Sequence, residues 1–404
     1  MKVLLIHHAS ALGGGSISLL DVVAMLREEH EVIVCAPASP SWLSSELERR
    51  GVEFSPAILP LPIYYHYNGT AGAPICWHLM LRGLLTYLRY RSAWIEVIRD
   101  SGAQIVIVNS AALCLFGPII RAAGAKPICF VRETFPPSSR SVRTRILYRV
   151  LGRHFSRSVF LSERDREAAA LPPSRAAVLL DCMRQDELRE KGRKEARREL
   201  SIAENYFWVL FTGGNSRLKG FDTALRAIGR TRLSEIRLLA VGVGGDAMTP
   251  NVKLRNWVAD PRNAYYRLRV AALLKSRSVQ ERVVLLGPRN DMSVPYSASD
   301  VVIFPSSLAH QARPVYEAGS FGLPIVISDF PSAAEFVFPG SNGLLIPPRD
   351  APKLAAALDM LASQREYCAA LGAENRRQHS SRRQFSVMQR LLVELVKDVG
   401  EEGP

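Results

Sequence analysis

The sequence lacks several features whose absence excludes whole classes of protein. No stretch reaches the ~18–20 unbroken apolar residues of a membrane-spanning helix. The longest candidate, Ile75–Leu88, is interrupted by His78 and Arg82. The six cysteines have no CxxC or other metal-ligand spacing, and several lie in apolar stretches, where cysteine behaves as a small hydrophobe. We therefore expect no spanning helix, no disulfide framework and a reduced, cytoplasmic compartment.

Acidic residues are scarce relative to basic ones. The chain has 52 Lys and Arg against 38 Asp and Glu, a net charge of +14. Such an excess predicts an anionic partner: nucleic acid, a phospholipid surface or a phosphorylated substrate. Between Arg140 and Arg157 there are six arginines and no acid, and Val142, Ile146, Leu147, Val150 and Leu151 recur there at helical spacing. We interpret this segment as a basic amphipathic helix, either a solvated face or a contact with acidic headgroups.

The order of apolar segments predicts two α/β domains. A chain of 404 residues with 48% hydrophobic and 22% charged residues is globular and too long for a single core. Short apolar strands alternate with helices, which is typical of parallel, doubly wound sheets. The expected strands lie within residues 2–8, 31–37, 103–110, 126–133, 158–163 and 177–181, and then within 206–214, 236–244, 282–288, 300–307, 323–329 and 342–348.

The expected boundaries follow from this order. Residues 1–184 would form the acceptor-binding domain and residues 185–380 the nucleotide-binding domain, with the charge-dense segment 185–199 as a bridge. A helix in residues 381–404 would pack back toward the first domain. In doubly wound folds the ligand crevice lies at the carboxyl ends of the strands, here in a cleft between the two domains.

A glycine-rich loop follows the first strand. Gly13, Gly14 and Gly15 let the backbone approach a ligand, and the helix that follows offers free N–H groups to an anion. The spacing is not the GxGxxG dinucleotide fingerprint, and no acid ends the second strand, which argues against a dehydrogenase. Glycine is also favoured at any such turn, so the loop by itself is weak evidence.

A similar loop opens the second half. In FTGGNSRLKGF, Gly213 and Gly214 form the turn, and Arg217 and Lys219 precede a helix that we expect to begin near Phe221. Two cations beside a helix N-terminus suit a diphosphate. Either cation alone would be an ordinary surface charge.

The third loop is the most informative. After a strand that ends at Pro305, Pro314 occupies a position suited to a first helical turn, and Glu317 follows about one turn into the helix. A carboxylate there can accept hydrogen bonds from two ribose hydroxyls, while the N–H groups at the helix start meet phosphate oxygens. An acid favoured only by the helix dipole is the alternative.

The run YEAGSFGLPIVISD, with EFV and GSNGLLIPPRD after it, resembles the donor-site signature of glycosyltransferase family 4, the retaining GT-B enzymes. The resemblance extends upstream through FTGGNSRLKGF and covers most of Tyr206–Leu361. It implies an α/β GT-B fold of two Rossmann-like doubly wound domains facing across a cleft. It also implies a nucleotide-sugar donor and transfer with retention of configuration, in which the enzyme stabilises charge on the departing diphosphate.

The resemblance also implies roles for individual residues. Glu317 would bind the donor ribose and Lys219 the diphosphate, and Arg313, Pro314 and Val315 would line the phosphate loop. Glu335 and Asn342–Gly343 would be supporting positions.

Two positions depart from the family pattern. Ala309 stands eight residues before Glu317, where the family usually has a second glutamate, and we hypothesise that His310 fills that sugar contact. Gly214 replaces an arginine, for which Arg217 could substitute.

Four further residues end strands at the same edge of the first sheet. His7 and His8 could supply the base of an inverting enzyme, or be structural histidines. Arg132 and Glu133 could orient the acceptor, or pair with each other. No DxD motif occurs in the chain, so we expect neither a metal nor another cofactor.

We therefore predict an enzyme that moves a sugar from a nucleoside-diphosphate sugar to a glycan or lipid-linked acceptor. The basic segment Arg140–Arg157 would contact an anionic membrane surface, at the inner membrane face. The alternatives are a nucleotide-sugar epimerase and a catalytically weak GT-B-like protein that binds a nucleotide or a membrane. A nucleic-acid-binding protein ranks last, because the chain has no helix-turn-helix, zinc finger or RNA-binding sheet motif.

Overall fold

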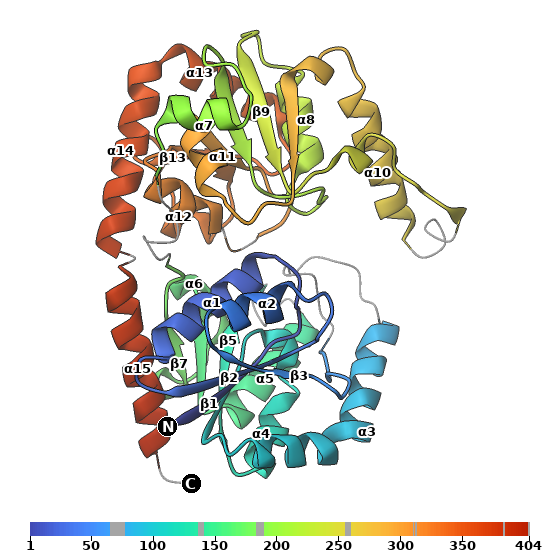
Figure 1. Ribbon diagram of the computed structural model, residues 1–404, viewed down its shortest axis with the longest axis vertical. Helices are drawn as coiled ribbons and strands as arrows, with labels where there is room; N and C mark the ends of the chain where they lie inside the picture. The colour runs from blue at the N-terminus through green and yellow to red at the C-terminus, as the bar shows by residue number, and fades with distance from the viewer. Residues whose placement is uncertain are drawn as a thin grey trace. The chain divides into compact units, whose positions relative to one another are not determined.

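The computed structural model describes residues 1–64, 77–135, 141–182, 190–254, 260–309, 311, 313–382 and 384–402. The chain divides into two compact units (Figure 1). The first contains Met1–Cys182 and Arg383–Pro404, and the second contains Met183–Arg382. The boundaries expected after residues 184 and 380 lie two residues from these divisions.

The first unit contains a parallel sheet whose described strands have the order β3-β2-β1-β4-β5-β6-β7. β4 is an unbroken IVIV run buried on both faces, as strands between two helical layers require. β3 has the sequence EFSP and lies at an edge of the sheet, where a proline is tolerated. Its weak apolar pattern explains why the sequence did not predict it. The strands are β1 (Lys2–Ile6), β2 (Glu31–Ala36), β3 (Glu53–Pro56), β4 (Ile105–Val108), β5 (Lys126–Val131), β6 (Arg157–Phe160) and β7 (Ala176–Val178).

Helices cover both faces of this sheet. α3, α4 and α5 share one apolar core with it, and α1, α2 and α15 share the other. The last helix, α15, thus completes the core of the first unit and packs against α1 (Figure 1). The helices are α1 (Gly14–Leu26), α2 (Trp42–Arg49), α3 (Trp77–Asp100), α4 (Phe116–Ala122), α5 (Val142–His154), α6 (Glu163–Ala169) and α15 (Phe385–Glu401).

The basic segment forms helix α5, but its buried face differs from the predicted one. Ser141 caps the helix by accepting a hydrogen bond from the Thr144 N–H. Leu147 and Leu151 are buried, whereas Val142 is 65% exposed and Ile146 is 41% exposed. Thr144 and Tyr148 complete the buried face in their place, because the helix turns that side toward the sheet. Arg140 lies outside the described residues.

The second unit contains a parallel sheet with described strands in the order β10-β9-β8-β11-β12-β13. Each of these strands lies inside a predicted apolar segment. The prediction of an α/β chain with two doubly wound parallel sheets is therefore confirmed. The strands are β8 (Phe207–Phe211), β9 (Ile236–Val241), β10 (Val283–Gly287), β11 (Val301–Phe304), β12 (Ile325–Ser328) and β13 (Gly343–Ile346).

Helices again form two layers. α8, α10 and α13 cover one face of the sheet, and α7, α11 and α12 cover the other, with α14 packed on α12. α7 packs on α11, and its buried Arg197 donates to Asp300 at 2.8 Å, so residues 193–199 belong to the second unit instead of bridging two domains. The helices are α7 (Arg193–Glu199), α8 (Phe221–Ile228), α10 (Pro261–Leu274), α11 (Ser293–Ala298), α12 (Arg313–Ser320), α13 (Ala351–Ser363) and α14 (Arg365–Arg382).

Each sheet reverses its strand order at one point. The reversal lies between β1 and β4 in the first unit and between β8 and β11 in the second. Ligands of open α/β sheets bind outside the carboxyl ends of the strands at such a point. None of the described helices combines the length and the apolar character needed to cross a bilayer.

Candidate functional site

The loop from β8 to α8 depends on glycine at three positions. Gly214 and Gly220 have positive φ angles of 64° and 81°, which side chains rarely adopt. A Cβ on Gly214 would lie 3.3 Å from the Gly242 carbonyl oxygen, and one on Gly220 would collide with the Pro305 carbonyl oxygen. A Cβ on Gly213 would overlap the Phe211 ring and approach Lys219. The loop is therefore closely packed between the ends of β9 and β11. Its backbone places Lys219 at the point where the strand order reverses.

Glu317 projects from the second turn of α12. Its Oε1 accepts a hydrogen bond from Arg313 Nε at 2.7 Å, and its Oε2 accepts one from the Tyr296 hydroxyl. The side chain of Glu317 is 12% exposed, so this carboxylate lies at the border between protein and solvent. Arg313 is the first residue of the helix. It precedes Glu317 by four positions, so the two side chains lie on the same face of the helix and form an ion pair.

Tyr296 connects α12 to the end of β8. It belongs to α11, is fully buried, and stacks on Phe321 with ring centroids 5.1 Å apart. Its hydroxyl also forms a hydrogen bond with the Thr212 side chain. Burial and the neighbouring Glu317 carboxylate raise the pKa of Tyr296 well above its usual value, so the hydroxyl stays a donor to Glu317.

The structure brings Lys219 and Glu317 into one electrostatic environment. Burial lowers the pKa of Lys219, and the Glu317 carboxylate opposes that shift. A carboxylate has such an effect on an ammonium only over a few ångströms. A half-buried cation and a half-buried anion therefore lie near each other at the carboxyl ends of β8 and β11, without an ion pair between them in the described part of the chain. An anionic ligand with hydroxyl groups could contact both.

The other predicted residues of this unit lie in different places. Pro314 and Val315 are buried in the first turn of α12. Arg217 lines a separate pocket, to which neither Lys219 nor Glu317 contributes. His310 lies outside the described residues, so the hypothesis about its sugar contact stays a prediction.

The residues expected to support the donor site, Glu335 and Asn342–Gly343, lie in turns of the second unit. Asn342 is buried, its Oδ1 accepts from the Phe338 N–H at 2.8 Å, and its Nδ2 donates to the Phe336 carbonyl at 2.9 Å. These bonds close the turn that precedes β13, which begins at Gly343. Glu335 ends the short 3₁₀ turn Ala333–Glu335 nearby.

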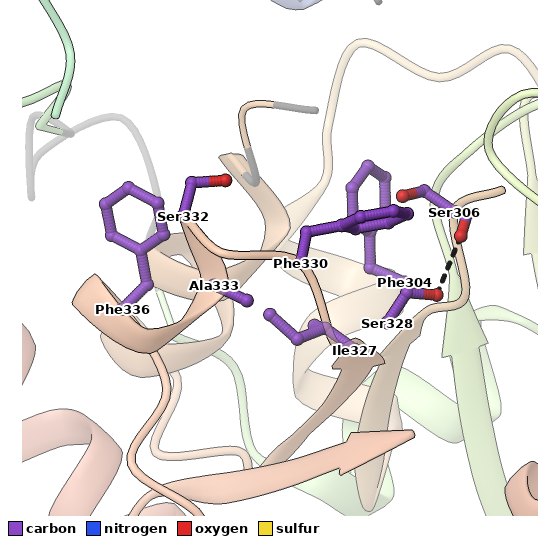
Figure 2. Close-up of a pocket in the computed structure, with 8 residues that line it drawn as sticks. All are labelled: Phe304, Ser306, Ile327, Ser328, Phe330, Ser332, Ala333 and Phe336. Carbon is purple, nitrogen blue, oxygen red and sulfur yellow. Dashed lines mark hydrogen bonds between the residues drawn. The ribbon is translucent and has the colours of Figure 1, made fainter. Parts of the chain in front are cut away.

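A small hollow lies at the carboxyl ends of β11 and β12 (Figure 2). Its volume is about 10 Å³, which is enough for one water molecule and far too small for a sugar. Ser328 donates to the Ser306 carbonyl at 2.7 Å across its wall. The hollow is a packing gap between phenylalanine rings. Its lining consists of Phe304, Ser306, Ile327, Ser328, Phe330, Ser332, Ala333 and Phe336.

The first unit has its own polar network at the reversal between β1 and β4. Ser16 donates to the Ala11 carbonyl, so its oxygen accepts from His7 Nε2 at 3.3 Å. His7 Nδ1 then accepts from Asn109 Nδ2, also at 3.3 Å. Burial, with His8 and Arg132 nearby, lowers the pKa of His7 well below its usual value. His7 is therefore a neutral histidine with both ring nitrogens engaged, which suits a structural role better than a base.

His8 differs from its neighbour. Burial lowers its pKa, and its Nδ1 has no hydrogen-bond partner among the described residues. Gly13 caps α1 and Gly14 is the first residue of that helix, and a Cβ on either would meet open space. Neither glycine has a positive φ in the described backbone, so the unit itself does not require glycine there. Because these glycines have no side chains, there is room beside the ends of the strands. Gly15 approaches His7, whose ring would lie 3.7 Å from a Cβ added at that glycine.

Arg132 and Glu133 each have their own partners, so the predicted pairing with each other is not found. Arg132 donates to Asn109 Oδ1 at 3.0 Å and forms an ion pair with Asp181. Glu133 is buried on the opposite side of the strand and accepts from the Ser110 hydroxyl and from the Ala111 N–H at 3.1 Å. Burial raises the pKa of Glu133, and the two hydrogen bonds oppose that shift.

Sequence reasoning missed several residues of both networks. Tyr296 and Thr212 support Glu317 from elements that carry no recognisable motif. Asp181 holds Arg132 from a position 49 residues away, and Asn109 links Arg132 to His7. The positions of Asn109 and Asp181, each at the end of a predicted strand segment, could have signalled a role. The described residues contain no group of three or more His, Cys, Asp or Glu side chains arranged to hold a metal.

Comparisons with known proteins agree with this geometry. Residues 192–378 match the family described as Glycosyl transferases group 1. D-inositol 3-phosphate glycosyltransferase of Corynebacterium kroppenstedtii is 26% identical over 232 residues, 53% of this chain and 46% of that protein. The chain spans about half the length of the curated relatives it matches.

Solved structures resemble the chain along its whole length. HepE of Anabaena in complex with UDP and glucose has a TM-score of 0.77 at 18% identity, with 98% of this chain and 99% of that one covered. WaaG, a glycosyltransferase involved in lipopolysaccharide biosynthesis, has a TM-score of 0.66 at 15% identity, with both chains fully covered. The chain thus has the GT-B fold, and its second unit carries a glycosyl transferases group 1 domain.

Proposed function

We propose that the chain is a hexosyltransferase of glycosyltransferase family 4 that moves a sugar from a nucleoside-diphosphate sugar to a glycan or lipid-linked acceptor. The proposal depends on one observation above all, the placement of Lys219 and Glu317 near each other at the strand reversal of the group 1 domain. The names of similar proteins support it, since one is a D-inositol 3-phosphate glycosyltransferase and HepE is described with UDP and glucose.

In this proposal the two side chains divide the donor between them. Glu317 accepts hydrogen bonds from the ribose hydroxyls, for which its partly exposed carboxylate has free lone pairs. Lys219, with the free N–H groups in the first turn of α12, among them that of Val315, stabilises the diphosphate as negative charge develops on it. Arg313 and Tyr296 are positioning residues that orient Glu317.

A reaction that retains the configuration of the anomeric carbon is compatible with the side chains of the first unit. The bond from the anomeric carbon to the diphosphate would break while the acceptor oxygen attacks from the same face, and the departing phosphate would take the acceptor proton. No separate base is then needed, which agrees with a His7 whose two ring nitrogens are engaged. His8, with the glycines Gly13–Gly15 at the start of α1, would contact the acceptor.

A donor panel tests the proposal. The protein is incubated with UDP-glucose and other nucleotide sugars, with and without a lipid-diphosphate-linked sugar or inositol 3-phosphate, and release of nucleoside diphosphate is measured. Acceptor-dependent release that disappears in Lys219→Met supports a transferase. Conversion of one nucleotide sugar into another without acceptor would show an epimerase instead. Stabilisation by UDP without any turnover would favour the catalytically weak protein, to which the loss of a glutamate at Ala309 points.

We also propose that the reaction needs no metal ion or other cofactor. The sequence has no DxD motif, and Lys219 with the α12 N–H groups would supply the positive charge that a metal provides in metal-dependent transferases. Turnover is expected to be the same in excess EDTA as in Mg²⁺ or Mn²⁺. A loss of turnover in EDTA that Mn²⁺ restores would refute this part.

We also propose that the protein binds an anionic membrane surface and acts there. On α5, Arg145 and Arg149 are exposed beside Val142 and Ile146. Helix α3 packs into the same core face and exposes four leucines at helical spacing, with Leu88 57% exposed, and no acid precedes Glu96 in it. Apolar side chains flanked by arginines suit the boundary between headgroups and acyl chains. The four leucines are Leu81, Leu84, Leu85 and Leu88.

Co-sedimentation with vesicles tests this surface. Binding to vesicles of phosphatidylglycerol and phosphatidylcholine should exceed binding to phosphatidylcholine alone, and should weaken when three α5 arginines become glutamine. A triple change of exposed arginines in the second unit is the matched control for net charge. An equal loss of vesicle binding in the α5 triple variant and in the control triple variant would contradict binding through a specific surface. The α5 set is Arg145, Arg149 and Arg153, and the control set is Arg198, Arg262 and Arg277.

A further inference from the structure

A second pocket lies beside the start of α8, on the face of the sheet that α8, α10 and α13 cover. Its volume is about 330 Å³. Residues from four separate parts of the second unit converge on it, namely the β8–α8 loop with α8, helix α10, the end of β11 and the β13–α13 loop. The lining residues are Arg217, Asp222, Thr223, Arg226, Arg269, Ser307 and Arg349.

Positive charge dominates this pocket. Four guanidinium groups face one carboxylate, that of Asp222, which pairs with Arg269 and, at 3.5 Å, with Arg226. Arg217 and Arg349 have no carboxylate partner within ion-pair distance among the described residues. Burial and the neighbouring Arg269 lower the pKa of Arg226, although Asp222 opposes them. The pocket therefore holds like charges together, and a bound anion would reduce their repulsion.

The backbone at Arg349 gives an independent indication. This residue has a φ of 63°, a conformation that is strained for a residue with a side chain and that glycine or asparagine adopts more easily. The cap of α13 comes from the next residue, Asp350, which accepts from the Lys353 N–H at 2.8 Å. An arginine at the strained position places its guanidinium at the pocket.

We propose that this pocket binds a small phosphorylated molecule at a site distinct from the proposed donor site. Planar guanidinium groups bind phosphate oxygens in pairs, and Thr223 adds a hydroxyl. The volume suits a phosphorylated metabolite and is too small for a macromolecule. The binding site does not depend on the proposed transferase activity, because neither Lys219 nor Glu317 lines it.

The pocket shares a wall with the loop that carries Lys219. The Ser307 hydroxyl donates to the carbonyls of Arg217 and Leu218 at 3.2 and 3.3 Å, and the Ser307 N–H donates to Leu218 at 2.7 Å. Arg217 stands two positions before Lys219, so a phosphate bound to Arg217 would lie beside the loop that carries Lys219. This proximity makes the donor-site variant Lys219→Met an essential comparison.

Calorimetric titration with inorganic pyrophosphate and phosphate tests the site. Arg349→Gln combined with Arg269→Gln should weaken pyrophosphate binding by about 10-fold or more, since each change removes a charged donor. Arg262→Gln combined with Arg277→Gln makes the same change in net charge on exposed positions and should leave binding unchanged. Equal binding by both double variants would overturn the proposal.

Two further arms distinguish this pocket from the donor site and from a site for lipid headgroups. If Lys219→Met removes all pyrophosphate binding while the arginine variant keeps it, pyrophosphate binds the donor site only and the proposal fails. If vesicles containing phosphatidate bind through these arginines but free pyrophosphate does not, the ligand is a lipid headgroup and the small-molecule assignment is wrong. Should Arg269→Gln impair folding by freeing Asp222, Arg349→Gln alone decides, because it breaks no ion pair within the described residues.

Discussion

The carboxylate of Glu317 is held before any ligand arrives. Arg313 and Tyr296 each occupy one of its oxygens, and Tyr296 is itself fixed by stacking on Phe321. Each carboxylate oxygen has two lone pairs, so both can still accept a ribose hydroxyl. A group fixed in this way loses little rotational freedom on binding, which strengthens the interaction.

Glu317→Gln should weaken UDP binding by about 10- to 100-fold, because it removes a charged acceptor worth roughly 1.5–3 kcal/mol. Titration calorimetry with UDP measures the loss. Glu366→Gln, an exposed acid on α14, is the matched control and should bind UDP normally. Unchanged affinity in Glu317→Gln would contradict the ribose role.

Tyr296→Phe tests the positioning of Glu317 separately from its charge. The change keeps the ring that stacks on Phe321 and removes only the hydroxyl that donates to the carboxylate. The KM for the donor should rise several-fold with little change in kcat. A variant with a lower melting temperature but an unchanged KM would indicate a purely structural tyrosine.

The buried histidines predict a pH dependence of stability. His7 is neutral in the folded protein because its pKa is lowered, whereas the unfolded chain binds a proton near the ordinary value of about 6.5. The unfolded state therefore binds more protons below that pH, and stability falls as the pH falls from about 7.5 to about 5.5. His7→Gln should shrink the difference in melting temperature between these conditions more than His154→Gln does, since His154 is only half-buried. Equal effects would contradict the assignment to His7.

At the scale of elements, the β8–α8 loop is the part most constrained by its neighbours. Its glycines allow it to pass between the ends of β9 and β11, and this passage sets the position of Lys219. The loop after β1 in the first unit is the opposite case, because Gly13 and Gly14 face open space. Two glycine-rich loops that look alike in sequence thus have different physical requirements.

Gly220→Ala should destabilise the second unit by about 2–5 kcal/mol, because a Cβ would collide with the Pro305 carbonyl at a positive φ. Gly51→Ala is the matched control, since Gly51 has a φ of 65° but no heavy atom within 4 Å of an added Cβ. Its cost should be only the backbone strain of about 1–2 kcal/mol. Thermal unfolding of both variants checks the difference. Similar losses would mean that the close packing around Gly220 relaxes.

At the scale of the whole chain, the last helix completes the first unit. α15 buries Leu392, Val393, Val396 and Val399 in the core that β1 and α1 share, and Lys126 donates to the Gly400 carbonyl at 2.8 Å. The core of the first unit is therefore built from segments far apart in the sequence.

Leu392→Ala should cost about 2–5 kcal/mol by opening a cavity in this core. Its neighbour Leu391 is 44% exposed on the same helix, and Leu391→Ala should cost less than about 1 kcal/mol. Urea unfolding followed by circular dichroism compares the two. A large effect at Leu391, or none at Leu392, would place α15 in a different orientation.

The sequence predicted much of the fold because its signals are local. Strands such as IVIV at Ile105–Val108 are unbroken apolar runs, and Pro314 and Glu317 mark the start of α12 without any tertiary information. The misses have a common cause. The exposed Val142 on α5 and the edge strand Glu53–Pro56 depend on which neighbours cover an element, and periodicity does not record that.

Two series of strands and helices follow from the amino-acid order alone, and so do the loops that meet at the carboxyl ends of the parallel strands. Chain order and hydrophobic pattern suffice for this, because each βαβ crossover has one hand. Which side chains meet at those ends depends instead on how the chain folds. Tyr296 with Glu317, Arg132 with Asp181 and the four arginines of the second pocket are joined across long stretches of chain. Such contacts depend on side-chain packing between elements, which local sequence patterns do not specify.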